Sequence, residues 1–209
     1  MNVTTNHSGG AIGSDSAWDS IGREFGITNH IHYYHQNKTP LGNTQISEIG
    51  YNEGRIESAK AAKLNWGYPY SAMKDSRLIR NWSQVKHSDA IFAIGSIVNI
   101  GERVFPNQPT DTRLAITQCV AGGTGYAVGM AINHNKPVFV FDQNREKWYT
   151  WRRNRFVECP IPVLTEQFAG IGTREIKQCG LDAIRSIYII WAWDQKILNQ
   201  AKELEACSY

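Results

Sequence analysis

The sequence lacks several features that would place a protein in a membrane or in an oxidising compartment. No run approaches the roughly 20 apolar residues of a membrane span, and the polar start MNVTTNHSGG does not resemble a signal peptide. The four cysteines form no CxxC pair, which favours free thiols in a reducing cytoplasm over a disulfide framework. These cysteines are Cys119, Cys159, Cys179 and Cys207. We therefore expect a cytoplasmic protein with no membrane partner.

Familiar catalytic arrangements are also absent. We find no Ser–His–Asp or Cys–His arrangement, and the segment GGTGYA at 122–127 lacks the Lys-Ser/Thr of a Walker loop, which argues against ATP hydrolysis. The net charge of +3 is too small to indicate a nucleic-acid-binding protein, although a local anion site needs only a few donors. Hydrophobic residues make up 42% and charged residues 20% of the chain, which fits a folded globular protein.

What the sequence does contain is an alternation of strand and helix patterns. Short apolar runs without polar alternation are typical of strands covered on both faces, as in a parallel sheet. They occur at 90–98, 137–142 and 166–172, and more weakly at 3–7. Helical patterns lie at 14–25, 47–66, 74–86, 126–133 and 174–204. The alternation predicts one α/β domain over 1–209, a Rossmann-like parallel sheet with helices on both faces. The segment 99–111 is expected to be a lid, a partner contact or an ordinary surface loop.

Three glycine-rich segments share one layout, in which a strand-like run ends in small residues before a helix. They are HSGGAIGSDSAW at 7–18, VAGGTGYAVGMA at 120–131 and FAGIGTREI at 168–176. Such turns let backbone N–H groups and a helix N-terminus face an anion, although tight strand-to-helix turns alone would have the same composition. We predict that Gly10, Gly95, Gly123 and Gly172 lie at the carboxyl ends of neighbouring parallel strands and form one pocket.

Together these three motifs resemble the SLOG superfamily of Rossmann-like domains, and most of all the SLOG-like proteins of large tailed phages. The superfamily includes the LOG phosphoribohydrolases, the DNA-processing protein DprA and nucleotide-sensing domains of bacterial immune effectors. The resemblance implies a ligand built from a nucleotide or a phosphoribosyl group. We expect no metal and no other cofactor. The expected ligand-binding residues are Ser8, Gly9, Gly10, Ala11, Asp15, Gly95, Ser96, Gly122, Gly123, Thr124, Gly125, Tyr126, Gly170, Gly172, Thr173 and Arg174.

Two departures from the family pattern are informative. Family members place the AGIGSR-like turn before the SGGA-like turn, whereas here FAGIGTRE comes near the C-terminus, as though the chain were circularly permuted. Such a permutation requires the strand ending at Gly170 to insert beside the one ending at His7. LOG enzymes also resemble one another in a PGGxGTxxE turn whose glutamate assists glycosidic bond cleavage. Here Val128, Gly129 and Met130 follow the turn and supply no carboxylate.

Several further residues allow more than one interpretation. Asp15 suits either a helix cap or a contact to a ribose hydroxyl, and Arg174 at a helix start favours an anionic partner. His30, His32 and His35 could suit a metal, but base stacking by Tyr33 or Tyr34, or plain packing, is favoured; Tyr126 is a further stacking candidate. A patch of arginines and aromatics at 148–155 favours a solvated face or an interface over DNA binding. It contains Trp148, Tyr149, Trp151, Arg152, Arg153 and Arg155.

Two main functions therefore compete. The protein either captures a nucleotide-derived small molecule, for example as a phage sponge for a cyclic ADP-ribose or cyclic oligonucleotide signal, or cleaves nucleoside monophosphates as an N-glycosidase. The acid of the enzyme would be Glu175, Asp15 or Glu53. A DNA-binding accessory role is a third, weaker option.

The C-terminal helical pattern predicts a homo-oligomer, because its apolar surface is broader than one sheet-facing stripe requires. The first stripe comprises Leu181, Ile184, Tyr188, Trp191 and Leu198, and the second comprises Ile187, Ile190, Trp193 and Ile197.

Overall fold

The computed structural model describes residues 4–34, 43–64, 69–99 and 118–206. Its centre is a sheet of eight strands, of which the first six in spatial order run parallel and the last two join by antiparallel pairing. In that order they are β3 (Thr44–Gln45), β2 (Asn29–Tyr34), β1 (Thr5–Ser8), β10 (Gln167–Gly172), β4 (Ala90–Gly95), β7 (Val138–Asp142), β8 (Lys147–Arg152) and β9 (Arg155–Glu158). The predicted α/β class with a mostly parallel, Rossmann-like sheet is confirmed.

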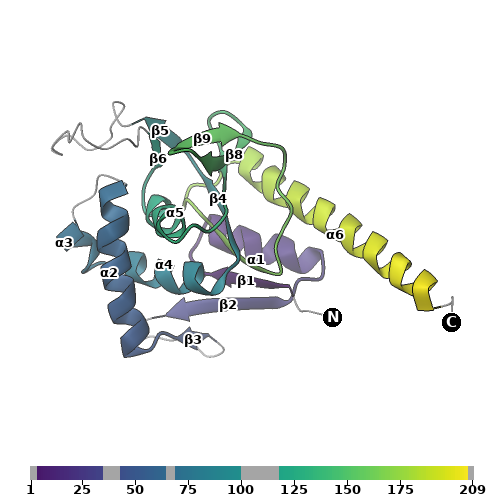
Figure 1. The fold of residues 1–209 in the computed structure, drawn as a ribbon, viewed down its shortest axis with the longest axis horizontal. Coiled ribbons are helices and arrows are strands. Elements are labelled where there is room, and N and C mark those ends of the chain that lie inside the picture. The colour runs from purple at the N-terminus through teal and green to yellow at the C-terminus, as the bar shows by residue number, and fades with distance from the viewer. Residues whose placement is uncertain (1–3, 35–42, 65–68, 100–117, 207–209) are drawn as a thin grey trace.

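Helices cover both faces of the sheet (Figure 1). One face carries α1 (Ser14–Glu24) and α6 (Gln178–Ala206), and the other carries α4 (Ser76–His87) and α5 (Thr124–Asn133). Outside that second pair lie α2 (Glu48–Leu64), which packs on both α4 and α5, and the short α3 (Pro69–Ala72). No helix in the described ranges is long and apolar enough to cross a membrane.

Strand β4 shows why its sequence is apolar throughout. Ile91 and Ala93 belong to the core beneath α4 and α5, whereas Phe92 and Ile94 belong to the core beneath α1 and α6. All four side chains are fully buried, because successive residues of a strand point to opposite faces and both faces are covered.

The predicted strand at 90–98 is in fact two strands. The chain leaves the main sheet at Ser96 and continues as β5 (Ile97–Asn99), which pairs antiparallel with β6 (Gln118–Val120). The Ser96 carbonyl accepts a hydrogen bond from the Ala121 backbone N–H at 2.9 Å, so the end of this small hairpin returns to the edge of β4. Apart from Asn99, the predicted loop at 99–111 lies outside the described residues.

Strands β8 and β9 were not predicted, because their turn lacks glycine. Arg153 and Asn154 hold its two central positions with φ values of 49° and 61°. Hairpin turns of two residues favour positive φ at both positions, which glycine and asparagine usually supply. Because arginine is unusual at the first of these positions, the sequence did not indicate a hairpin turn here.

Strand β10 inserts between β1 and β4 although it is the last strand in the sequence. Its Gln167 and Phe168 pair in parallel with Thr5 and Asn6 of β1. This is the position that a circular permutation requires, next to the strand that precedes the first glycine turn.

The two predicted stripes of α6 do not separate core from surface. Ile187, assigned to the outer stripe, is fully buried, whereas Leu198, assigned to the core stripe, is 51% exposed. The reason is the length of α6, whose C-terminal half extends beyond the sheet (Figure 1). Position along the axis, and not the helix face alone, decides burial here.

Candidate functional site

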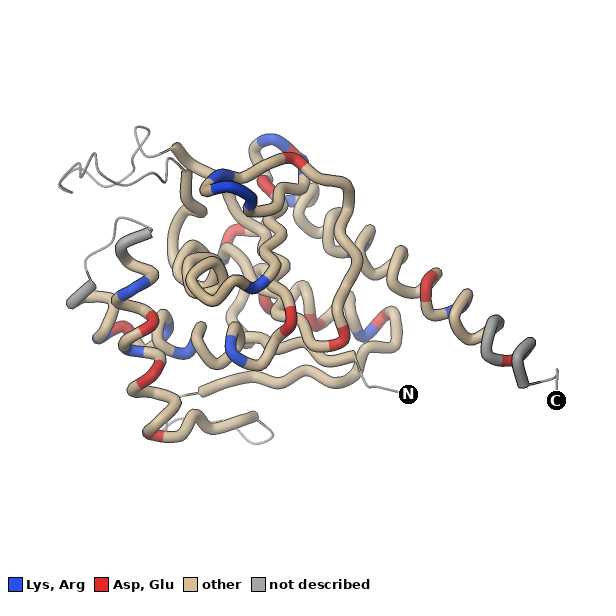
Figure 2. The backbone as a smooth tube through the Cα atoms, in the orientation of Figure 1, with Lys and Arg blue, Asp and Glu red and all other residues tan. Residues whose placement is uncertain are grey.

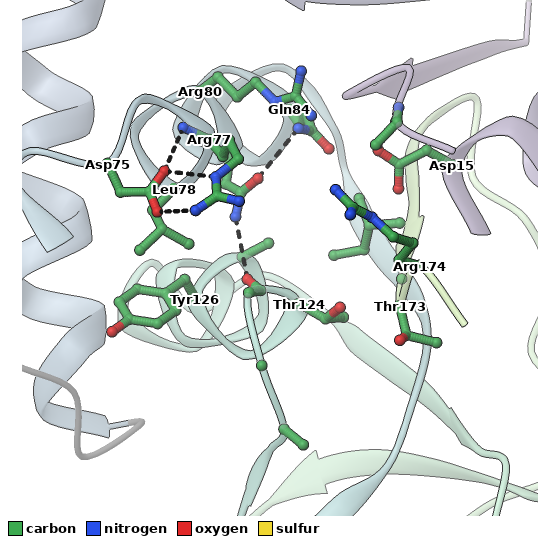
Figure 3. A pocket seen from close by; sticks show the side chains of 18 of the residues that line it. Asp15, Asp75, Arg77, Leu78, Arg80, Gln84, Thr124, Tyr126, Thr173 and Arg174 are labelled. Carbon is green, nitrogen blue, oxygen red and sulfur yellow. Dashed lines mark hydrogen bonds and ion pairs between the residues drawn. The ribbon is translucent and has the colours of Figure 1, made fainter. Parts of the chain in front are cut away.

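A cavity of about 520 Å³ opens at the carboxyl edge of the sheet. Its walls are the turn between β1 and α1, the polar side of α4, the turn between β6 and α5, and the end of β10 with the residues after it. Figure 3 shows α4 on one side of this pocket and α5 on the other, with Arg174 extending between them. The helix that follows β1 is α1, which lies on one face of the sheet. The helix that follows β4 and the β5–β6 hairpin is α5, which lies on the opposite face. Crevices of α/β sheets that bind ligands form where the direction of winding reverses in this way.

Nine of the ligand-binding candidates line this pocket. They are Ala11, Asp15, Gly122, Gly123, Thr124, Tyr126, Gly172, Thr173 and Arg174. All three glycine-rich turns therefore contribute to one cavity, as the sequence predicted, although Ala11 in the first turn and Arg174 in the third are about 160 residues apart in the chain.

The other candidates do not line it. The Ser8 hydroxyl accepts a hydrogen bond from the Gly10 N–H at 3.1 Å, and Gly125 is buried in the first turn of α5. Gly95 and Ser96 hold backbone contacts at the end of β4. Gly170 lies inside β10, where an added Cβ would be 2.5 Å from Cγ of Trp18, so this glycine serves helix–sheet packing.

Two details of the predicted arrangement are wrong. Gly10 and Gly95, which were expected to help form the pocket, are not among its lining residues. Gly10, Gly172 and Gly95 follow or end the neighbouring parallel strands β1, β10 and β4, as expected. Gly123 instead follows β6, which belongs to the separate antiparallel hairpin with β5. Its turn reaches the pocket because that hairpin folds back over the end of β4.

In two of the three turns, groups of the protein itself accept from backbone donors. In the turn after β1, the Ala11 N–H donates to the Asp15 carboxylate at 3.3 Å. In the turn after β10, the Thr173 N–H donates to the Ile94 carbonyl at 2.9 Å, and the Gly172 N–H also interacts with the Asp15 carboxylate. The Asp15 carboxylate thus accepts from the backbone N–H groups that an external anion would otherwise use in these two turns.

The turn before α5 differs from the other two. Within the described ranges, no hydrogen-bond acceptor is found for the backbone N–H groups of Gly122, Gly123 and Thr124. Gly122 has a φ of 70° and Gly123 is the helix N-cap, and both are exposed at the pocket. Three free donors at the positive end of a helix form an anion-binding arrangement.

Asp15 has an unusual environment for a carboxylate. It is 7% exposed, and burial raises its pKa to about 6, against the opposing effects of the Ala11 N–H and the Arg80 charge. Asp15 is therefore an ionised but poorly solvated group at neutral pH, and it takes up a proton in mildly acidic solution.

Three arginines line the pocket, and they differ in their partners. Arg77 is held by Asp75, whose carboxylate accepts from Nε at 3.0 Å and from Nη2 at 2.8 Å. Arg80 lies over the ring of Tyr34, 5.9 Å from its centroid, and its buried Nε has no acceptor in the described part of the chain. Neither Arg80 nor Arg174 forms an ion pair with any described carboxylate. These two cations can neutralise an anionic ligand.

The contribution of α4 to the pocket was missed at the level of sequence. Its pocket residues Arg77, Arg80, Asn81 and Gln84 follow the i, i+3, i+4, i+7 spacing of one helix face. Ile79, Trp82 and Val85 form the opposite, buried face. The sequence therefore does contain a polar stripe that marks these pocket residues. Such a stripe is ordinarily the solvated side of an amphipathic helix, so it did not indicate a pocket.

Two of the three candidate acids lie outside the pocket lining. Glu53 accepts hydrogen bonds from Lys86 Nζ at 2.7 Å and from Trp82 Nε1 at 3.1 Å, on the side of α4 that contacts α2. Glu175 is exposed and follows Arg174 without lining the cavity. Asp15 is the candidate acid that does line it.

The histidines near β2 have structural partners. Nε2 of His32 is 2.6 Å from Oδ2 of the buried Asp19, and His30 also contacts that carboxylate. Burial opposes ionisation of Asp19, but the two histidines hold its pKa at about 2. No group of three residues able to ligate a metal is found in the described ranges, and His35 lies outside them.

The aromatic candidates for base stacking differ in position. Tyr126 lines the pocket, whereas the ring of Tyr33 is 4% exposed and stacks on His7 and His87. Tyr34 lies beneath Arg80 instead.

The patch of arginines and aromatics belongs to the β8–β9 hairpin. Trp148 is buried in the core beneath α6, and Trp151 packs on the opposite core, so these rings support the sheet. Arg152, Arg153 and Arg155 are exposed. Figure 2 shows Lys and Arg interspersed with Asp and Glu along the described chain.

No protein-family model, no curated protein and no solved structure matches this chain.

Proposed function

We propose that the protein captures a phosphorylated, nucleotide-derived small molecule in the pocket between α4 and α5. One observation carries this proposal: the same cavity is lined by Gly122, Gly123 and Thr124, whose N–H groups have no acceptor among the described residues, and by two arginines. These arginines, Arg80 and Arg174, form no ion pair with a described carboxylate. A phosphate at the helix start would accept from the backbone, and the arginines would neutralise its remaining charge.

The resemblance to the SLOG superfamily supports the same class of ligand. The SGGA motif follows β1 and the AGIG motif lies in β10, and these two strands are neighbours in the sheet. The family order would require this neighbourhood after circular permutation. We therefore propose that the chain is a permuted SLOG-like domain. In it the GGTG turn binds the phosphate of the ligand, and the SGGA turn does not.

Capture is favoured over turnover because the helix that receives the phosphate carries no acid. Val128, Gly129 and Met130, on the helix turn where the LOG resemblance would place its glutamate, supply no carboxylate and are buried. A positioned acid or base contributes about 10²–10⁴-fold to a rate, so its absence should leave binding with little catalysis.

An N-glycosidase remains the second candidate, and one observation favours it. Asp15 lies in the pocket with its pKa raised by burial to about 6, a value suited to proton transfer near neutral pH. In this alternative Asp15 alone, and neither Glu53 nor Glu175, would assist departure of the base.

In a bacteriophage, a capture protein of this kind would act in the host cytoplasm as an anti-defence sponge. It would lower the concentration of an immune signal such as cyclic ADP-ribose or a cyclic oligonucleotide. This setting comes from the family resemblance.

Native mass spectrometry of protein purified from cells that make such signals tests the proposal. We expect a co-purifying nucleotide mass that is recovered intact after denaturation, in a ratio of one per site. Incubation with excess nucleoside monophosphates separates the two candidates. Repeated turnover to free base that is lost in Asp15→Asn would establish the enzyme instead.

Gly123 offers a matched pair of variants for the same experiment. Among the described residues, an added Cβ would find only Leu78 Cδ2 within 4 Å, at 3.6 Å, so Gly123→Ala should fold and bind as the wild type does. Gly123→Trp would fill the space beside the free N–H groups and should abolish ligand recovery. Equal recovery from both variants would place the ligand elsewhere.

A further inference from the structure

The pocket contains a buried acceptor with no donor. Gln84 is 1% exposed and lines the cavity, and its Oε1 has no hydrogen-bond partner in the described part of the chain. Its Nε2 reaches Asn81 Oδ1 only at 3.4 Å. A buried acceptor without a donor costs folding free energy, so its presence at a pocket wall indicates that a ligand supplies the missing donor.

A second acceptor lies at the same end of the pocket. The position that a Cβ of Gly9 would occupy is 2.7 Å from Asp15 Oδ2 and 2.9 Å from Gln84 Nε2. The absent side chain of Gly9 therefore lets the Asp15 carboxylate lie near the amide nitrogen of Gln84, and the oxygen without a partner belongs to the same carboxamide. Figure 3 shows both side chains at this end of the pocket. A carboxylate accepts about four hydrogen bonds, and in the described part of the chain the backbone N–H groups of Ala11 and Gly172 supply two of them.

The charge around these acceptors restricts what can bind to them. Nη2 of Arg80 lies 3.1 Å from the same point beside Gly9, so a cationic group there would meet an arginine. A phosphate there would meet the Asp15 carboxylate. A neutral group that carries hydrogen-bond donors avoids both repulsions.

We propose that Asp15 and Gln84 form a subsite for two adjacent neutral hydrogen-bond donors of the ligand whose phosphate lies at the start of α5. The inference rests on the proposed function and adds the orientation of the ligand in the pocket. Anionic groups lie at the α5 end, and the donors lie at the α4–β1 end. Vicinal hydroxyls of a pentose and adjacent N–H groups of a purine both present such a pair.

Titration calorimetry with two pairs of probes distinguishes pentose hydroxyls from purine N–H groups as the two donors. Ribose 5-phosphate and 2-deoxyribose 5-phosphate differ in one hydroxyl, and GMP and IMP differ in one amino group. We expect the donor-bearing member of at least one pair to bind about tenfold more tightly, because a hydrogen bond to a charged or buried acceptor is lost in the other. Inorganic phosphate serves as the probe without donors of this kind.

Gln84→Met and Asp15→Asn then test the assignment to these residues. Each should reduce the tenfold preference to nearly none while inorganic phosphate still binds. Gln84→Met keeps the length of the side chain and removes the unpaired acceptor, so its unfolding temperature should equal or exceed that of the wild type. This comparison separates a lost contact from a lost fold.

The outcomes are distinct. Phosphate-dependent binding without preference in either pair, or a preference that survives both substitutions, would overturn the subsite and leave the proposed function standing. If none of the phosphorylated probes binds, the proposed function fails together with the subsite.

Discussion

At the scale of single residues, the site is organised around the buried carboxylate of Asp15. It takes the backbone donors of two glycine turns, lies near Arg80, and faces the cavity with Gln84. Because an internal anion occupies these turns, an external one is directed to the start of α5. A single side chain thus decides which of three similar turns can bind phosphate.

Asp15 should make stability depend on pH in a predictable direction. Burial raises its pKa from 3.8 to about 6, so the folded protein keeps a proton that the unfolded chain releases within this interval. The cost of burying the ionised group is absent below about pH 4, grows as the pH rises, and is complete above about pH 6.

Asp15→Asn should therefore stabilise the protein above pH 6 by at most about 3 kcal/mol, and much less near pH 4. Urea unfolding of both proteins across this range measures the difference. Asp19 is present in both proteins, where its two histidines hold its pKa low, and its repulsion of Asp15 is a smaller effect than burial. A difference that does not change with pH would contradict the assignment.

Gly170 and Gly123 should respond oppositely to the same substitution. A Cβ at Gly170 would lie 2.5 Å from the fully buried Trp18, whereas at Gly123 the nearest atom is 3.6 Å away. Gly170→Ala should lose about 1–3 kcal/mol of unfolding free energy through overpacking, and Gly123→Ala should lose little. Thermal unfolding of the two variants checks this, and a destabilised Gly123→Ala would contradict the open space at the start of α5.

At the scale of secondary-structure elements, α4 has two functions on its two faces. Its apolar face packs on the sheet, and its polar face forms a wall of the pocket opposite α5. Asn81 Nδ2 also donates to the Gly123 carbonyl at 3.3 Å, which ties α4 to the turn that holds the free donors. The width of the pocket therefore depends on how α4 and α5 pack together.

Two arginines one turn apart on α4 allow a controlled test of anion binding. Arg77 already holds Asp75, whereas Arg80 has no carboxylate partner among the described residues. Arg80→Gln should weaken binding of a phosphodiester nucleotide by about ten- to hundredfold, and Arg77→Gln much less.

Calorimetry at two salt concentrations measures both effects, because a lost ionic contact also reduces the salt dependence of binding. A phosphodiester is the suitable probe, since its charge does not titrate near neutral pH. Equal losses from the two substitutions would show that Arg80 does not contact the anion.

At the scale of the whole molecule, the C-terminal half of α6 leaves apolar side chains exposed. Trp193 is 64% exposed, Ile197 59% and Leu198 51%, on a helix that extends away from the domain (Figure 1). A contiguous apolar surface of this kind marks a protein–protein contact, and an identical chain is the partner that is always present.

We therefore predict a homo-oligomer assembled through α6. Light scattering at micromolar concentration should give a mass above that of one chain. Trp193→Ser combined with Ile197→Glu should give monomers with an unchanged unfolding temperature, because neither side chain contributes to the core. A wild-type monomer under these conditions would refute the prediction.

Much of the architecture follows from local sequence. The apolar runs that became β4, β7 and β10 require cover on both faces, and parallel strands place the turns that follow them at one edge. These two facts predicted the α/β class, the helices on both faces and the meeting of three glycine turns in one cavity. Residues within a few positions of each other carry all of this information.

The tertiary structure alone decided which of those turns keeps its donors free. The Thr173 N–H is used by Ile94, and Asp15 interacts with the Gly172 N–H from the far end of the sequence. It also decided that the polar side of α4 faces a cavity and not solvent, and that Gly170 lies under Trp18. A local pattern determines which residues can donate, accept or be buried, but hydrogen-bond partners are set by contacts between distant segments. For that reason the sequence determined where the pocket forms, and only the fold determined which of its groups remain available to a ligand.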